Sequence, residues 1–248
     1  MSGHSKWANI KHRKGRADAV RGVATTKIGR EITIAVRIGG ADLTGNMRLR
    51  LALQKAKENN IPKDNIQRAI QKGQGTLEGL SYEEITYEGY GAAGVALLVE
   101  TMTDNRNRTA AEMRHLFSKH GGNMGESGCV SWMFHKKGLV LIEKTPKLQE
   151  EDLLAIVLDA GAEDLNSEGE QFEVTCAPED FEAMVNALEA AKIKWDSAEI
   201  SMIPETTIAL TGDDATKLMK FVDALEEQDD VQAVYGNFDI PDEEEDAD

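Results

Sequence analysis

The chain has few cysteines and no long apolar segment. Its two cysteines, Cys129 and Cys176, lie far apart and form no metal-binding spacing. We expect both to be reduced thiols in a cytoplasm, with a disulfide between them as the alternative. The longest clean apolar run, GVALLV at residues 94–99, is too short to span a membrane. No apolar stretch follows the charged start, which excludes a secretory signal.

Catalytic signatures are also missing. None of the histidines belongs to an H-E-x-x-H motif or another ligand spacing, and no G-x-S-x-G or Cys/His pair is present. The stretch GYGAAG, residues 89–94, matches G-x-G-x-x-G, but it connects two strands where a nucleotide-binding loop connects a strand to a helix. A hairpin turn explains it better. We therefore predict a protein that is not an enzyme, with no cofactor and no metal site.

What the chain does have is charge, distributed unevenly. The formal net charge is −16, from 28 Lys and Arg against 44 Asp and Glu. Residues 1–75 hold 16 Lys and Arg against 5 Asp and Glu, a net charge of +11, whereas residues 76–248 hold 12 against 39, a net charge of −27. A polyanion is attracted to the first segment and repelled by the second. The tail PDEEEDAD, residues 241–248, is expected to be a solvated acidic end.

Three helices are predicted in the basic segment. The first covers about residues 17–38, with Ile28, Ile32 and Ala35 on one stripe. The second covers about residues 46–60, and the third begins at Pro62 and ends at Gly73, with Ile66 and Ile70 as its buried face.

The pattern changes period after a linker at residues 73–79. Strands are predicted at residues 81–91, 94–102 and 129–134, with a helix at 107–122 between the last two. Residues 138–204 then follow a βαββαβ order, and residues 205–238 a βαβ order. We predict a multidomain α+β protein: an N-terminal three-helix domain plus two α/β sandwich (ferredoxin-like) domains, one inserted in the other. The predicted boundaries are 1–75, 80–135 with 205–240, 136–204, and the tail 241–248.

The basic N-terminal arm is the first candidate site. Lysine and arginine neutralise phosphates and release counterions, and a tryptophan among them can stack on an unpaired base, worth ~1–3 kcal/mol. The alternative is a solvated basic tail whose Trp7 packs on the helical domain. The candidate nucleic-acid-binding residues of the arm and the first helix are His4, Lys6, Trp7, Lys11, His12, Arg13, Lys14, Arg16, Arg21, Lys27 and Arg30.

A strand-to-helix junction is the second candidate site. Thr109 and Glu112 have the spacing of a capping box, and arginines just before a helix N-terminus make a phosphate site plausible. The glycine-rich segment 119–128 is expected to be flexible, and either faces the same partner or only ends the helix. The candidate residues of the junction are Asp104, Asn105, Arg106, Asn107 and Arg108.

Three stretches resemble the YebC/PmpR family, which includes the mitochondrial translational activator of cytochrome c oxidase subunit I. They are GHSKWANIKHRKGRADA, TDNRNRTAAEMRHLFSKHGGNMGESGCVSWMF and DSAEISMIP. The resemblance implies three domains and a role as a DNA-binding transcriptional regulator or as a ribosome-associated factor that assists elongation through difficult sequences. It points to the arm and to residues 104–108. The start MSGHSKW, without a leader, is typical of a bacterial cytoplasmic member. Val20, Val23 and Thr25 stand where the family usually has Lys, Lys and an aromatic residue.

The first hypothesis is therefore a non-enzymatic, nucleic-acid-binding regulator of gene expression. No clear helix-turn-helix signature is present, and an arm with Trp and His among its cations suits single-stranded RNA. We favour ribosomal RNA or a ribosome-bound state as the partner, with promoter DNA close behind and no membrane contact. Two alternatives stay open: an enzyme acting on RNA or nucleotides through an acid/base pair near Asp104, and a protein–protein adaptor using the acidic domains.

Overall fold

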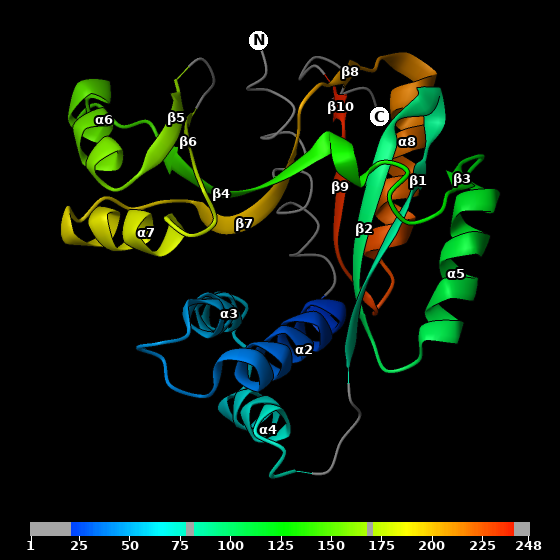
Figure 1. Ribbon diagram of the computed structural model, residues 1–248, viewed down its shortest axis with the longest axis horizontal. Coiled ribbons are helices and arrows are strands. Elements are labelled where there is room, and N and C mark those ends of the chain that lie inside the picture. Colours follow the sequence, from blue (N-terminus) through cyan, green and yellow to red (C-terminus); the bar gives the residue numbers. More distant parts are fainter. Residues whose placement is uncertain (1–20, 78–81, 168–170, 241–248) are drawn as a thin grey trace. The chain divides into compact units, whose positions relative to one another are not determined.

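The computed structural model describes residues 21–77, 82–167 and 171–240 (Figure 1). The predicted N-terminal arm and the acidic tail lie outside these residues. Two compact units are present: one contains Trp132–Thr207, and the other contains the described residues before and after that segment. None of the described helices is long and apolar enough to cross a membrane.

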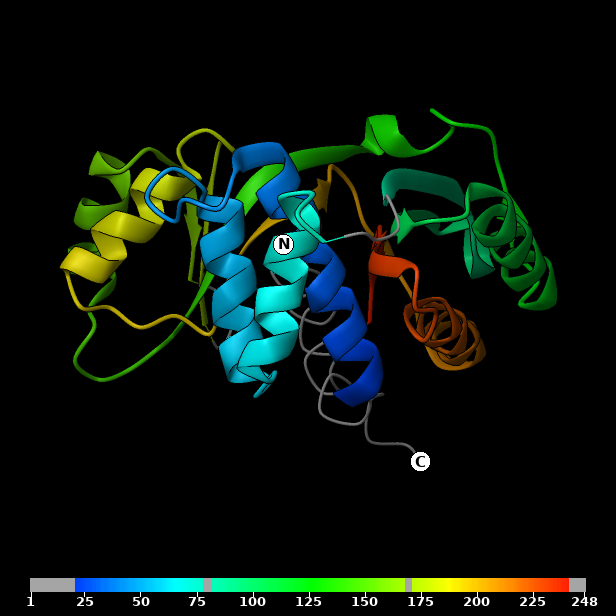
Figure 2. The same cartoon turned by 90° about the horizontal axis from the view of Figure 1, so that it is seen from below.

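The basic segment folds as three helices, α2 (Arg21–Gly39), α3 (Met47–Glu58) and α4 (Lys63–Gly73), as the sequence predicts. Figure 2 shows them running alongside one another. Small side chains let α3 and α4 approach α2 closely, and Ile66 and Ile70 are only partly buried where the sequence predicts the buried face of α4. The buried core of this bundle consists of Ile32, Ala35, Val36, Leu49, Ala52, Ala56, Ile61 and Ala69.

Asn46 fixes the turn between α2 and α3. Its Oδ1 accepts a hydrogen bond from the N–H of Leu49 at 3.0 Å, which caps the first turn of α3. Its Nδ2 donates to the backbone oxygens of Ala35 at 2.8 Å and Gly40 at 2.7 Å. One buried amide therefore starts α3 and closes the end of α2.

The unit Trp132–Thr207 contains a ferredoxin-like sandwich. Its sheet has the order β5-β6-β4-β7, and every neighbouring pair is antiparallel. Helix α6 connects β4 to β5 across β6, and the βαββαβ order predicted from the sequence is confirmed. The elements are β4 (Phe134–Glu143), α6 (Glu150–Asp159), β5 (Ala162–Asn166), β6 (Gln171–Cys176), α7 (Phe181–Ala190) and β7 (Ser197–Pro204).

The second sandwich is interrupted by the first. Its sheet has the order β3-β1-β2-β9, so β1, predicted as a strand at residues 81–91, lies inside the sheet. The turn η1 (Ala92–Gly94) connects β1 to β2 as the predicted hairpin. The elements are β1 (Glu83–Tyr90), β2 (Ala96–Thr103), α5 (Arg106–Lys119), β3 (Asn123–Met124), α8 (Gly212–Glu226) and β9 (Val231–Gly236).

One predicted strand is wrong and another is much shorter than predicted. Where the sequence predicts a strand at 129–134, residues 129–133 form a bend and a short helix, η2 (Ser131–Met133), Phe134 begins β4, and β3 takes the edge of the sheet instead. Residues 205–212 contribute only β8 (Ile208–Ala209), which pairs with β10 (Phe238–Asp239) in a separate two-stranded sheet. Two-residue strands carry too little alternation to be recognised from sequence.

Helices α5 and α8 share one core with the β3-β1-β2-β9 sheet. The rings of Phe117 on α5 and Phe221 on α8 meet edge to face, with centroids 4.9 Å apart. Val95, Leu97 and Val99 from the β2 region belong to the same buried cluster. This packing holds α5 by one side, so that its opposite side faces solvent.

Candidate nucleic-acid interface

The arm residues of the first candidate site lie outside the described part of the chain. They are His4, Lys6, Trp7, Lys11, His12, Arg13, Lys14 and Arg16. Arg21 begins α2, but its side chain also lies outside what is described. Lys27, Arg30 and the junction at residues 104–108 lie within the described part of the chain.

A buried carboxylate organises the junction. The side chain of Asp230, at the start of β9, is 4% exposed. Its Oδ2 accepts hydrogen bonds from Thr109 Oγ1 at 2.6 Å, Thr103 Oγ1 at 3.0 Å and Arg108 Nη2 at 2.9 Å. Its Oδ1 accepts from Arg30 Nη1 at 2.7 Å. One carboxylate therefore joins the end of β2, the first turns of α5, and α2.

These partners set the protonation of Asp230. Burial pushes the pKa of this carboxyl up, but the hydrogen bonds from Thr109, Arg108 and Thr103 and the charge of Arg30 together bring the pKa below its usual value. The carboxylate is therefore ionised at neutral pH and balances two guanidinium groups.

Two cationic side chains attach α2 to the sandwich that contains α8. Arg30 also donates to the backbone oxygens of Met102 and Asp229, and its side chain is 11% exposed. Lys27 Nζ donates to the backbone oxygen of Glu226, at the end of α8. Both residues were predicted to contact nucleic acid, and the structure gives both an intramolecular partner.

The junction itself is a capped helix start. Asn105 is the N-cap of α5: its Oδ1 accepts from the N–H of Arg108 at 3.1 Å. The predicted capping box at Thr109 and Glu112 is wrong because α5 begins earlier, at Arg106. Thr109 is instead fully buried inside the helix, where its hydroxyl bridges Thr103 and Asp230.

The two arginines of the junction differ in their surroundings. Arg108 Nη2 bonds to Asp104 Oδ1 at 2.9 Å as well as to Asp230, although its side chain remains 44% exposed. Arg106 and Asn107 are exposed in the first turn of α5. Within the described residues, no ion pair engages the guanidinium of Arg106. Arg106 is therefore the arginine of this junction that is open to a ligand.

The glycine-rich segment after α5 is held in place. Glu88, buried on β1, accepts hydrogen bonds from the N–H groups of Gly128, Val130 and Ser131 at 2.7–2.9 Å. Burial alone would raise the pKa of Glu88, but these N–H donors bring it below its usual value. An internal carboxylate therefore occupies the backbone N–H groups that this loop would offer to an external anion, and the flexibility of residues 119–128 stays a prediction.

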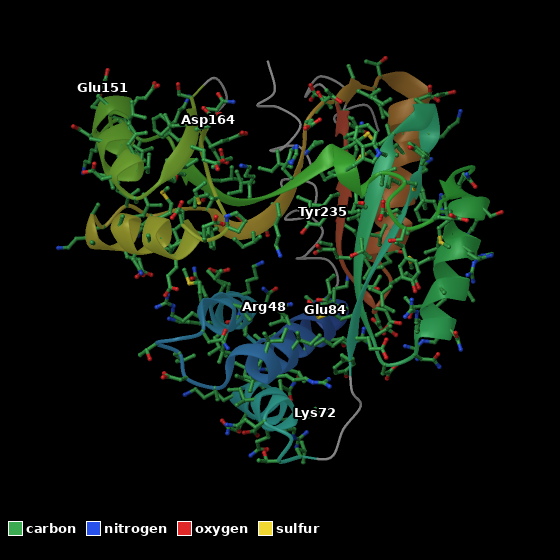
Figure 3. The ribbon with its side chains drawn as sticks, viewed as in Figure 1. Arg48, Lys72, Glu84, Glu151, Asp164 and Tyr235 are labelled. Atoms are coloured by element: carbon green, nitrogen blue, oxygen red, sulfur yellow. The ribbon has the colours of Figure 1, made fainter. Side chains whose placement is uncertain are left out.

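The three-helix bundle presents further cations to solvent. Arg48 is paired with Glu31 at 2.6 Å and with Glu84 on β1 at 2.7 Å; Figure 3 labels Arg48 and Glu84. Exposed basic side chains that carry no ion pair within the described residues are Lys57, Lys63, Arg68 and Lys72.

The described part of the chain offers neither a candidate metal-binding cluster nor an activated thiol. No cluster of three or more His, Cys, Asp or Glu residues that could hold a metal ion is found there. Both cysteines are free thiols, and burial raises the pKa of Cys176 to about 11.

Comparison with known proteins places the chain in a family. Residues 5–76 match the TACO1/YebC protein N-terminal domain, and residues 82–238 match the TACO1/YebC second and third domain. The chain is a member of the TACO1/YebC family. A relative from Carboxydothermus hydrogenoformans, named a probable transcriptional regulatory protein, is 58% identical over 98% of this chain and 100% of its own length. A relative of the same name from Desulforapulum autotrophicum is 56% identical, with both chains fully covered.

The TACO1/YebC fold is also found in a solved structure. A conserved hypothetical protein from Aquifex aeolicus is 45% identical and superposes with a TM-score of 0.83, over 96% of this chain and 98% of that one. The resemblance read from the sequence motifs is thereby confirmed, as is the α+β class with one sandwich inserted in the other.

Asp230 and Glu88 are the positioning residues that the sequence did not reveal. Asp230 lies in the acidic run EEQDD, which resembles a solvated surface, and Glu88 lies in an alternating strand pattern. No local signal distinguishes either residue, because its partners come from segments far away in the chain.

Proposed function

We propose that this member of the TACO1/YebC family is a non-enzymatic regulator of gene expression that acts by binding nucleic acid. The observation that carries the proposal is the partition of charge. A net +11 on residues 1–75 beside a net −27 on residues 76–248 gives the molecule one end that attracts phosphates. The names of its relatives, probable transcriptional regulatory proteins, support a regulatory role.

The contact surface of the proposal has two parts. The arm and the exposed cations of the bundle neutralise phosphates, and Trp7 stacks on an unpaired base. At the junction, Arg106 and Asn107 contact the ligand. Lys27, Arg30 and Arg108 hold α2 and α5 in position for this contact through their hydrogen bonds to internal partners. Asp104 and Asn105 contribute by setting the start of α5.

Of the two nucleic acids, RNA on the ribosome is the partner we propose. A helix-turn-helix protein sets its recognition helix across the preceding one to enter the major groove. The helices α2, α3 and α4 instead run alongside one another (Figure 2). Single-stranded or irregular RNA, which offers unstacked bases, is better matched to a basic arm containing Trp7.

The observations favour the two remaining hypotheses less. An enzyme acting near Asp104 needs a carboxylate able to exchange protons with a substrate, but Asp104 is 16% exposed and bonded to Arg108. An adaptor working through the acidic domains leaves the basic end without a role.

Ribosome co-sedimentation set beside gel shifts on promoter DNA tests the proposal. We expect the full chain to pellet with ribosomes in a salt-sensitive manner, and to shift specific and scrambled promoter fragments equally weakly. Sequence-dependent DNA shifts without co-sedimentation would instead establish a DNA-binding regulator. Binding to neither would contradict nucleic-acid recognition altogether.

A further inference from the structure

The solvent face of α5 is a basic surface of which the predicted sites cover only the first turn. The sandwich to which it belongs, residues 82–131 and 208–240, holds only six Lys and Arg against 15 Asp and Glu. Four of those six cations lie on the single helix Arg106–Lys119, which contains only one acidic residue, Glu112. Cations this concentrated on an otherwise acidic domain indicate a binding surface.

The helical positions sort these side chains into a strip with two basic edges. At 100° per residue, Arg114 lies at one edge of the exposed face and Arg108 and Lys119 lie at the other, whereas Arg106 projects from the first turn on the side of the buried residues. The middle of the face carries the small or polar residues Asn107, Ala111 and Ser118, all of them exposed. A narrow centre with cations on both sides fits a chain of phosphates lying between them.

The cations of α5 differ in their partners. Burial raises the pKa of Tyr87 on β1, and the charges of Arg106 and Arg114 act in the opposite direction. Within the described residues, neither of those arginines nor Lys119 forms an ion pair with a carboxylate. Arg108 does, so the cations open to a ligand are Arg106, Arg114 and Lys119.

We propose that the strip formed by Asn107, Arg114, Ser118 and Lys119 continues the contact at the junction along α5 and binds the sugar–phosphate backbone of the same RNA that the basic arm binds. This inference rests on the proposed function and extends it along α5 beyond the junction. From Asn107 to Lys119 the strip is about 18 Å long along the helix axis.

A protein partner is favoured less by the composition of the strip. Protein–protein interfaces are built around buried apolar and aromatic side chains. The large apolar side chains exposed in the described part of the chain lie on other elements, such as Leu154 and Leu158 on α6, and none is on α5. Arginine, asparagine and serine on a strip without apolar anchors match phosphate and sugar contacts instead.

Fluorescence anisotropy with a labelled single-stranded RNA of 30 nucleotides tests the strip. The full chain carrying Arg114→Gln and Lys119→Gln is compared with one carrying Lys217→Gln and Lys220→Gln, two exposed lysines of α8 in the same domain. Both variants lose two charges, so the comparison removes the effect of net charge. We expect the α5 variant alone to bind roughly tenfold more weakly at low salt, with a log K against log salt slope shallower by about 1.4. The charge-retaining variant Arg114→Lys, Lys119→Arg should restore the slope.

Each other outcome overturns a definite part of the proposal. Normal wild-type binding with equal effects in the two Gln variants would remove the strip but leave the proposed function intact. Normal RNA binding by the α5 variant with lost ribosome co-sedimentation would assign the strip to a ribosomal protein. No RNA binding by the wild-type chain would overturn the proposed function, and the strip with it.

Discussion

Asp230 shows how one residue can hold a candidate site together. Its carboxylate receives donors from α2, from the end of β2 and from α5, and both it and Arg30 are almost fully buried. An ion pair of this kind contributes little net stability as a whole, but removing one partner leaves the other charge buried without compensation.

We therefore predict that Asp230→Asn destabilises the fold by about 3 kcal/mol, because Arg30 is left with a buried, uncompensated charge. The neighbouring Asp229→Asn is the matched control, since Asp229 is exposed and Arg30 bonds only to its backbone oxygen. That variant should stay within about 0.5 kcal/mol of wild type. Denaturant unfolding measures both, and equal stabilities would show that the buried cluster has no such role.

The carboxyl of Asp230 also makes the stability of the fold depend on pH in the acid range. A carboxyl whose pKa is lowered by folding adds stability above its unfolded pKa of about 3.9, and that stability is lost as the pH falls through the lower folded value. The contribution of Asp230 should therefore be constant from neutral pH down to about pH 4 and disappear below it. The Asn variant should lack this acid-dependent portion.

The roles of individual residues were the hardest part to predict from sequence. Arg108 and Asp230 are separated by 122 positions, and Arg30 and Asp230 by 200. Composition identified Arg30 and Arg108 as cations beside a candidate site, but only the folded chain brings an internal carboxylate to them. Arg106, two positions away from Arg108, has the same local signal and stays open to solvent.

At the scale of the elements, helices α2 and α4 approach so closely at Gly73 that a larger side chain there would collide with α2. A Cβ atom on Gly73 would lie 2.6 Å from the backbone oxygen of Thr33 and 2.7 Å from Val36 Cβ. On Gly29, in the middle of α2, a Cβ would meet nothing within 4 Å. The two glycines occupy helices of the same bundle and differ in the space around them.

Gly73→Ala should destabilise the bundle by about 1–3 kcal/mol because the backbones of α2 and α4 must separate. Gly29→Ala should stabilise it by about 0.5–1 kcal/mol, since alanine favours the helix and fills open space. Hydrogen exchange in α2 and α4 measures both effects. Equal shifts in the same direction would contradict the close contact.

Whole elements were predicted better than residues. The inserted sandwich follows from alternating strands and helical spacing that repeat in a βαββαβ order, and the three-helix bundle follows from apolar stripes ended by glycines. The split sandwich was harder. Its edge strand β3 has two residues, and β1 lies inside the sheet through pairing that no local pattern encodes.

At the scale of the whole molecule, the domains differ in the sign and size of their net charge. Residues 136–204, which form most of the inserted sandwich, carry six Lys and Arg against 16 Asp and Glu. Figure 3 labels two of these acids, Glu151 on α6 and Asp164 on β5. Such a domain repels phosphates and favours binding that involves the basic end and the strip on α5.

The salt dependence of RNA binding by an arm variant is the sharpest test of phosphate binding by the basic end. Lys11→Ala, Arg13→Ala and Lys14→Ala in one full chain are compared with Lys136→Ala, Lys147→Ala and Lys194→Ala, three exposed lysines of the acidic domain. We expect the arm variant to bind single-stranded RNA more weakly, with a log K against log salt slope shallower by about 2, while the control keeps the wild-type slope. An arm variant with an unchanged slope would contradict phosphate binding by the basic end of this protein.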